Sequence, residues 1–167
     1  MFNQTACRAA QEVYAVKAQA RVTIERSVSD VFDYVTDVAN MPAWMTGVQA
    51  ATPVDGTMAA GARYSLQYTA GWRPYELEVT VTEYERPVAF ASQVSRGPFA
   101  FEGTMTFVAR DGGTEITNSI EAGPDSVASR VASLLFGWLL RRSMSRRLLR
   151  ELETLQHSIE DDTTLNA

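Results

Sequence analysis

The sequence has very few of the side chains that usually build metal sites or covalent cross-links. Cys7 is its only cysteine and His157 its only histidine in 167 residues. One cysteine excludes an intramolecular disulfide and a zinc site made of cysteines. Neither an HxxxH nor a CxxC spacing occurs, so the pattern predicts no metal, no cofactor and no Ser-His-Asp triad. His157 lies near the end of a predicted helix, where the helix dipole favours a cation.

Long hydrophobic runs are also missing. The longest apolar segment, 131–140, is much shorter than the ~20 residues that a membrane-spanning helix needs. Residues 1–20 have no apolar stretch of the length found in secretory signal peptides. The sequence therefore predicts no transmembrane segment and a cytoplasmic location.

Charge is segregated along the chain. The whole sequence carries a net charge of −5, yet residues 130–150 contain six arginines and no acid, which leaves −11 on the rest. The arginines are not interleaved with aromatic side chains in the manner of a nucleic-acid-binding surface. We therefore expect no nucleic-acid partner, and we expect the basic segment to be one element on an acidic body.

The order of hydrophobic periods predicts an α+β domain. Residues 18–26 alternate as a half-buried strand, and Ser27 or Ser29 can cap the short helix that follows. Asp37 can cap a second short helix that stops near Pro42. Period-two alternation then runs from Gly61 to Gly123, broken by turn sequences, which indicates an antiparallel meander of about six to seven strands in total. A long C-terminal helix is the element available to cover its apolar face.

Several segments together resemble one family. The segment VFDYVTDVANMPAW, followed in order by GARY, VTVTEYERP, GGTEIT and LRELETL, is similar to the polyketide cyclase/dehydrase-like proteins of the START/Bet v 1 (helix-grip, SRPBCC) superfamily. Val88 and Ala89 depart from the family pattern, which often has an arginine after the preceding proline. The resemblance implies a helix-grip fold over residues 18–160, between an N-terminal segment 1–17 and a tail 161–167. It also implies binding of hydrophobic or amphipathic small molecules between sheet and helix, and it transfers no catalytic residue.

Alternation places several polar groups on the apolar face of the sheet. A buried phenol or amide without a hydrogen-bond partner costs about 1–3 kcal/mol. These groups therefore either bond to backbone and neighbours or face a partly polar ligand cavity. The predicted ligand-binding residues on this face are Tyr64, Tyr68, Tyr75, Ser92, Phe99, Phe101, Met105 and Asn118.

Two tryptophans outside the long helix are further candidates. Trp44 ends the family segment, so it either packs in the core or lines the mouth of a pocket. Trp72 lies in the turn TAGWRP, where an aromatic ring on the rim of a pocket is one interpretation. Gly103 lies among large inward residues of its strand, so it either bends the strand or leaves room for a ligand.

The long helix supplies the remaining candidates. At 100° per residue its apolar stripe includes Trp138 and is interrupted by Ser145, with Arg141 and Arg142 near its edges. This polar window could hold an anionic or hydroxylated head group, although both arginines could also extend along their stems to water. The stripe is predicted to contain Val127, Val131, Leu134, Trp138, Leu148, Leu149, Leu152 and Ile159. Arg146, Arg147 and Arg150 are predicted to point to solvent.

Three functions follow from these observations. The first is binding of a lipid- or polyketide-like small molecule in a cavity under the helix. The second is a polyketide cyclase or aromatase of the same fold, which would fold a flexible chain so that its reacting carbons meet. The third is a docking protein that uses Phe136 and Leu140, on the back of the helix, to contact a partner, a second copy or a membrane.

Overall fold

The computed structural model describes the backbone of residues 16–98, 100–122 and 127–162, and the side chains of residues 17–98, 100–121 and 141–161. The elements, in chain order, are β1 (Val16–Ile24), α2 (Val28–Thr36), the 3-10 helix η1 (Val38–Asn40), α3 (Met41–Trp44), β2 (Val48–Pro53), β3 (Arg63–Ala70), β4 (Arg73–Glu85), β5 (Ala89–Arg96), β6 (Phe101–Arg110), β7 (Gly113–Ala122) and α4 (Val127–Asp162).

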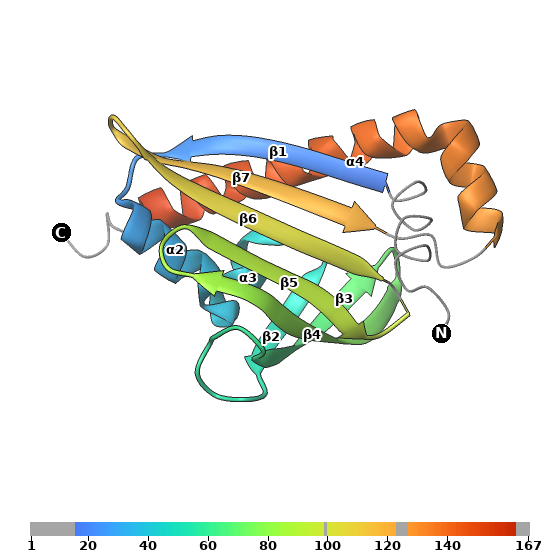
Figure 1. The fold of residues 1–167 in the computed structure, drawn as a ribbon, viewed down its shortest axis with the longest axis horizontal. Coiled ribbons are helices and arrows are strands. Elements are labelled where there is room, and N and C mark those ends of the chain that lie inside the picture. The colour runs from blue at the N-terminus through green and yellow to red at the C-terminus, as the bar shows by residue number, and fades with distance from the viewer. Residues whose placement is uncertain (1–15, 99, 123–126, 163–167) are drawn as a thin grey trace, which may run out of the picture.

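The seven strands form one antiparallel sheet in the order β1-β7-β6-β5-β4-β3-β2. Every neighbouring pair except β1–β7 is consecutive in sequence, so the sheet is a meander to which the first strand is added at one edge. In Figure 1 the long helix α4 runs behind the sheet along β1 and β7. The predicted α+β helix-grip architecture, with two short helices after β1 and a long C-terminal helix, is confirmed.

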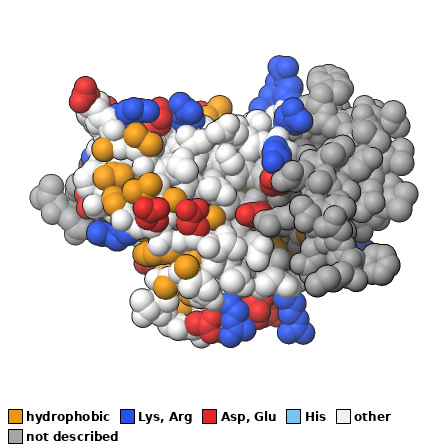
Figure 2. Space-filling view, viewed as in Figure 1, with side chains coloured by type: hydrophobic (Ala, Val, Ile, Leu, Met, Phe, Trp, Pro, Cys, Tyr) orange, Lys and Arg blue, Asp and Glu red, His pale blue; other side chains and the backbone are white. Residues whose placement is uncertain are grey.

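The two faces of the sheet differ as the alternation predicted. On β4, Leu77, Val79 and Val81 are each at most 1% exposed, whereas Glu76 and Thr82 are exposed. Figure 2, viewed as Figure 1, shows the face turned away from α4, where acidic, basic and hydrophobic side chains are scattered among other side chains and backbone. The buried face must therefore be covered from the other side.

The short helices follow local capping chemistry. The hydroxyl of Ser27 accepts a hydrogen bond from Asp30 N at 3.2 Å and starts α2. The carboxylate of Asp37 accepts one from Ala39 N at 3.0 Å and starts η1. Pro42 does not stop this segment as expected, because it occupies the first turn of α3, where no intrahelical N–H bond is needed. The strand β2 was not predicted, since VQAATP has little alternation.

The second half of α4 supplies the cover for the core. Leu152 and Leu155 are fully buried, and Leu148 is 2% exposed. Leu149, which the predicted stripe included, is 40% exposed. The predicted stripe assumes 100° per residue along the whole helix. A small error in this angle accumulates along the helix, so that near its C-terminal end the stripe is displaced by one residue. On the other side of the core, the ring of Phe32 lies edge-on to Phe107, with 5.1 Å between centroids.

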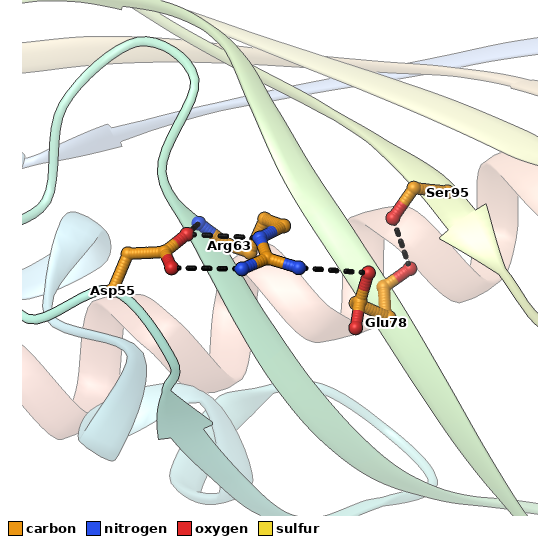
Figure 3. A network of polar contacts seen from close by, with 4 residues as sticks. All are labelled: Asp55, Arg63, Glu78 and Ser95. Atoms are coloured by element: carbon orange, nitrogen blue, oxygen red, sulfur yellow. Dashed lines mark hydrogen bonds and ion pairs between the residues drawn. The ribbon is translucent and has the colours of Figure 1, made fainter.

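A surface ion cluster ties the loop after β2 to the sheet (Figure 3). The guanidinium of Arg63 donates to both carboxylate oxygens of Asp55 at 3.0 Å and lies 3.6 Å from Glu78. The hydrogen bonds from Arg63 hold the pKa of Asp55 below its usual value. These side chains lie on the solvent face, so the cluster fixes the loop rather than a ligand site.

The first and last described elements are β1, which begins at Val16, and α4, which ends at Asp162. The division into an N-terminal segment, one domain and a tail stays a prediction. Within the described ranges, no helix combines the length and apolar character needed to cross a bilayer. In the same ranges, no three His, Cys, Asp or Glu side chains are grouped closely enough to hold a metal ion.

Candidate functional site

An apolar cavity of about 310 Å³ lies between the concave face of the sheet and α4. This volume is at the lower end of the range of small-molecule pockets, about 300–1,000 Å³. The sheet, the turn after α3 and α4 all contribute to its wall. Its lining residues are Met45, Thr46, Val48, Leu66, Tyr68, Ala70, Ala100, Phe101, Ile120, Met144, Arg147, Leu148 and Glu151.

An ion pair between a buried carboxylate and a half-exposed arginine forms the polar part of this wall. The carboxylate of Glu151, a residue only 4% exposed, accepts hydrogen bonds from Arg147 Nε at 2.9 Å and from Thr46 N at 3.1 Å. A terminal nitrogen of Arg147 donates to the carbonyl oxygen of Thr46. The pair therefore joins α4 to the turn after α3 through the backbone N–H and the backbone carbonyl of Thr46. Removing Arg147 would leave the buried carboxylate of Glu151 poorly compensated, which is costly, whereas the half-exposed guanidinium of Arg147 could be solvated without Glu151.

The charge of Arg147 is maintained despite its partial burial. Desolvation acts to lower the pKa of the guanidinium, but its interactions with Glu151 and Tyr68 outweigh this effect and the net pKa is raised. The guanidinium carbon lies 5.8 Å from the centroid of the Tyr68 ring, within the range of a cation–π contact. The expectation that Arg147 points to solvent is met only in part: its side chain is 43% exposed, but the carboxylate of Glu151 and the ring of Tyr68 hold it at the cavity.

Gly47 brings the turn after α3 against Tyr68. Its φ is +88°, and a Cβ at this position would lie 2.8 Å from Thr69 O and 2.9 Å from the Tyr68 ring. Only glycine fits so close an approach at this φ. The carbonyl oxygen of Gly47 also accepts a hydrogen bond from Thr69 N at 2.7 Å. The turn and the start of β2 are thereby fixed to the end of β3, at the rim of the cavity.

Open space also lies along the inner face of β6. Gly103 pairs with Ser92 on one side and with Ile120, a cavity-lining residue, on the other. A Cβ built on Gly103 would meet no atom of the described residues within 4 Å, and the backbone there does not require glycine. Of the two sequence interpretations, room beside the cavity therefore describes this glycine better than a bend in the strand.

The phenol of Tyr64 is bonded within the protein. Tyr64 is 3% exposed, and its hydroxyl donates to Ser92 Oγ at 3.2 Å. Burial raises its pKa to about 12, and the Ser92 hydroxyl, which can donate to the ionised phenolate oxygen, opposes this rise only in part. A phenol with this pKa stays protonated at neutral pH and does not serve as a general base.

The same shift predicts a loss of stability at alkaline pH. The folded state holds the Tyr64 proton more tightly than the unfolded chain, so this contribution is complete below the unfolded pKa of about 10 and is lost as pH rises through the folded pKa. The difference between about 10 and about 12 corresponds to about 3 kcal/mol. We expect the unfolding free energy of Tyr64→Phe, measured by denaturant titration, to fall less steeply over this interval than that of the wild type. Parallel curves would contradict the assignment.

Four other predicted residues pack in or against the core. Trp44 is 4% exposed, and its indole N–H is the buried side-chain donor without a hydrogen-bond partner among the described residues. Asn118 is 6% exposed on β7, opposite Met105, which is equally buried. Tyr75 is half-buried and packs against the core cluster. For these four residues, binding of a ligand stays a prediction.

The remaining predicted residues lie at or outside the cavity. Tyr68 and Phe101 line it. Trp72 is 81% exposed, with the Arg73 guanidinium 4.7 Å above its ring. Arg141, Arg142 and Ser145 border a separate groove between β1 and α4. Phe99 and the side chains of Phe136, Trp138 and Leu140 lie outside the described residues, so the predictions for them stay as they were.

The main cavity residue that sequence reasoning missed is Glu151, together with its partner Arg147. A signal was present, because Glu151 lies three residues after Leu148 and four before Leu155 and therefore falls on the buried face of α4. Arg147 precedes it by four residues, which is the spacing of a helical ion pair. An acid on an apolar stripe with a basic residue one turn away predicts a paired, buried carboxylate.

Comparison with known proteins gives one family and a consistent fold. Residues 15–158 match the family described as "Polyketide cyclase / dehydrase and lipid transport". No curated protein matches the sequence at a significant level. Among solved structures, TTHA0849 from Thermus thermophilus is 16% identical, with a TM-score of 0.71 over 87% of this chain and 98% of that chain.

Two further structures show the same fold at low identity. A START superfamily protein from Mycobacterium smegmatis is 14% identical, with a TM-score of 0.63 over 87% of this chain and 97% of that one. The di-domain ARO/CYC StfQ from the steffimycin biosynthetic pathway is 11% identical, with a TM-score of 0.72 over 94% of this chain and 54% of that one. At these identities the similarity shows the fold alone.

Proposed function

Because the chain belongs to the polyketide cyclase / dehydrase and lipid transport family, we propose that it binds an amphipathic small molecule in the cavity under α4. The observation that carries the proposal is the combination of a mostly apolar wall with one ion pair, Arg147–Glu151, whose carboxylate is buried. An apolar pocket with a few convergent polar groups is the usual form of a small-molecule site.

The composition of the wall indicates the chemistry of the ligand. Leu66, Phe101 and Ile120 offer contacts to a hydrocarbon or aromatic body. Arg147 has five N–H donors, of which two make the hydrogen bonds to Glu151 and to the Thr46 carbonyl. Because Glu151 neutralises the guanidinium charge, a remaining donor suits an oxygen-bearing head group, such as a hydroxyl, carbonyl or acidic oxygen.

The energetics require such a polar contact. Burying ~300 Å² of apolar ligand surface contributes roughly 7 kcal/mol at ~25 cal/mol/Å². The loss of translational and rotational freedom on association, together with the ordering of side chains, costs at least ~4 kcal/mol. The remainder corresponds to binding of roughly millimolar strength or poorer, so useful affinity depends on Arg147 or on a larger apolar contact.

Two fluorescent probes test the role of Arg147. Arg147→Gln is expected to weaken binding of 1-anilinonaphthalene-8-sulfonate about tenfold or more, because a hydrogen bond to a charged group contributes about 1.5–3 kcal/mol. Binding of N-phenyl-1-naphthylamine, which has no such oxygen, should change much less. Fluorescence titration measures both affinities.

The matched control is Arg150→Gln, since Arg150 is exposed on the same helix and its removal changes the net charge equally. Thermal unfolding of both variants, followed by circular dichroism, shows whether the fold is retained. Equal weakening of the two probes by Arg147→Gln would contradict a head-group contact. If Arg150→Gln weakened binding of the anionic probe equally, the effect of Arg147 would be one of net charge and not of a specific contact.

A cyclase or aromatase is the second candidate, supported by the family and by the fold shared with StfQ. Binding is favoured over catalysis because the carboxylate at the cavity, that of Glu151, already accepts hydrogen bonds from Arg147 and from Thr46 N. Mass spectrometry of the molecules released from denatured protein distinguishes the two. One unchanged small molecule favours binding, whereas a linear chain together with its cyclised product favours the enzyme.

A further inference from the structure

Besides the cavity, α4 borders a basic groove along β1, the edge strand of the sheet. A depression of about 620 Å³ separates β1 from α4, and its lining includes Arg141, Arg142 and Arg146. Leu149 borders the same groove and is 40% exposed. This surface is distinct from the ligand cavity, because it lies on the side of α4 that faces β1 rather than the turn after α3.

The charge of the three arginines is not cancelled by ion pairs among the described residues, although Glu102 and Glu121 line a neighbouring depression together with Arg141. All three side chains are exposed, and none of them makes an ion pair within the described part of the chain, where the only α4 arginine in a salt bridge is Arg147. The fourth basic residue of the groove, Arg21, is paired with Glu115 at 3.5 Å. No acid occurs between residues 130 and 150, whereas the rest of the chain carries −11. An anionic surface would therefore attract this groove and repel most of the remaining protein.

We propose that this face of α4, defined by Arg141, Arg142, Arg146 and Leu149, docks on an anionic phospholipid bilayer. Arg142, Arg146 and Leu149 share one side of the helix at spacings of four, three and seven, and Arg141 precedes Leu149 by eight residues, just over two turns. A helix that combines basic side chains with an apolar contribution is the arrangement found in interfacial membrane binding.

Two observations favour a bilayer over an acidic protein. The ten residues that precede Arg141 in the same helix, 131–140, contain no charge and are mostly apolar. In Figure 1 the backbone of the first part of α4 extends beyond the end of β1. A bilayer supplies phosphate groups and hydrocarbon over such a length, whereas an acidic peptide would contact only the groove.

Vesicle flotation tests the proposal on the full chain. The protein is expected to float with phosphatidylglycerol-rich vesicles at about 0.01 M salt and to be released at about 1 M salt, where the Debye length falls from about 30 to about 3 Å. It should not float with vesicles of pure phosphatidylcholine. The variant Arg141→Gln, Arg142→Gln, Arg146→Gln should bind the anionic vesicles about 100-fold more weakly, at about 1 kcal/mol for each arginine.

The control variant carries the same change in net charge elsewhere: Arg73→Gln, Arg96→Gln and Arg110→Gln, all at exposed positions on strands. It should bind the anionic vesicles nearly as well as the wild type. No flotation with phosphatidylglycerol at low salt would overturn the proposal, as would equal flotation with phosphatidylcholine. So would equal losses in the two triple variants, because they would show that net charge alone governs the attraction. These outcomes are independent of what the cavity under α4 binds.

Discussion

Leu152→Ala is expected to lower the free energy of unfolding by about 2–5 kcal/mol. Leu152 is fully buried on the face of α4 that covers the sheet, and Leu148 and Leu155, one turn away on either side, are also buried. Truncation removes the transfer free energy of the lost methyl groups and leaves a cavity that the rigid sheet cannot fill by relaxation. Denaturant unfolding measures the change. Since small domains are stable by only about 5–15 kcal/mol, this loss is a large part of the total.

The same substitution at Leu149 is the matched control. Leu149 lies on the same helix three residues earlier and is 40% exposed, so Leu149→Ala should change the unfolding free energy by less than about 0.5 kcal/mol. Helix propensity changes equally in both variants and cancels from the comparison. Similar losses at the two positions would mean that the buried face of α4 is assigned to the wrong residues.

Gly103→Leu is expected to weaken binding of N-phenyl-1-naphthylamine at least tenfold while the protein stays folded. The new side chain would project into the open space beside Ile120, which lines the cavity. Loss of even two methylenes of buried contact corresponds to about a tenfold change at ~0.8 kcal/mol each. Replacing a strand glycine whose backbone does not need it should leave stability unchanged or raise it by up to about 1 kcal/mol.

Thr106→Leu adds a similar side chain to the exposed face of the same strand and should leave probe binding unchanged. Fluorescence titration of the three proteins, with their unfolding curves, separates occlusion of the cavity from a general change in the strand. Unaltered binding in a folded Gly103→Leu variant would show that the probe does not extend along β6. A loss of stability would show that the space is closed in solution.

Much of the fold was predictable because it depends on local patterns. Period-two alternation correctly placed Leu77, Val79 and Val81 inside, and a polar side chain before an apolar run located the start of α2 at Ser27. The strand β2 was missed because its placement depends on Gly47 and on pairing with β3, which are contacts between segments distant in sequence. Local periodicity carries no information about such partners.

The residues of the candidate site also fall into those predictable from local patterns and those that depend on contacts between distant segments. Tyr68 and Phe101 were predicted from alternation and line the cavity, because a strand fixes which face each side chain occupies. Arg147 was assigned to solvent, because the angle around a long helix does not reveal which turn of the chain approaches it. Only the packing of α3 against α4 brings Thr46 to Glu151 and draws Arg147 to the cavity.

The sequence by itself determined the family, the order of the elements and the segregation of six arginines into an acid-free segment. These are properties of local patterning and composition, which exist before the chain folds. The tertiary structure alone decided how those arginines divide, with Arg147 paired at the cavity and Arg141, Arg142 and Arg146 along the groove beside β1. The physical reason is that the role of a charge depends on the distance and burial of its partners, and those are set by how a helix is rotated against a sheet.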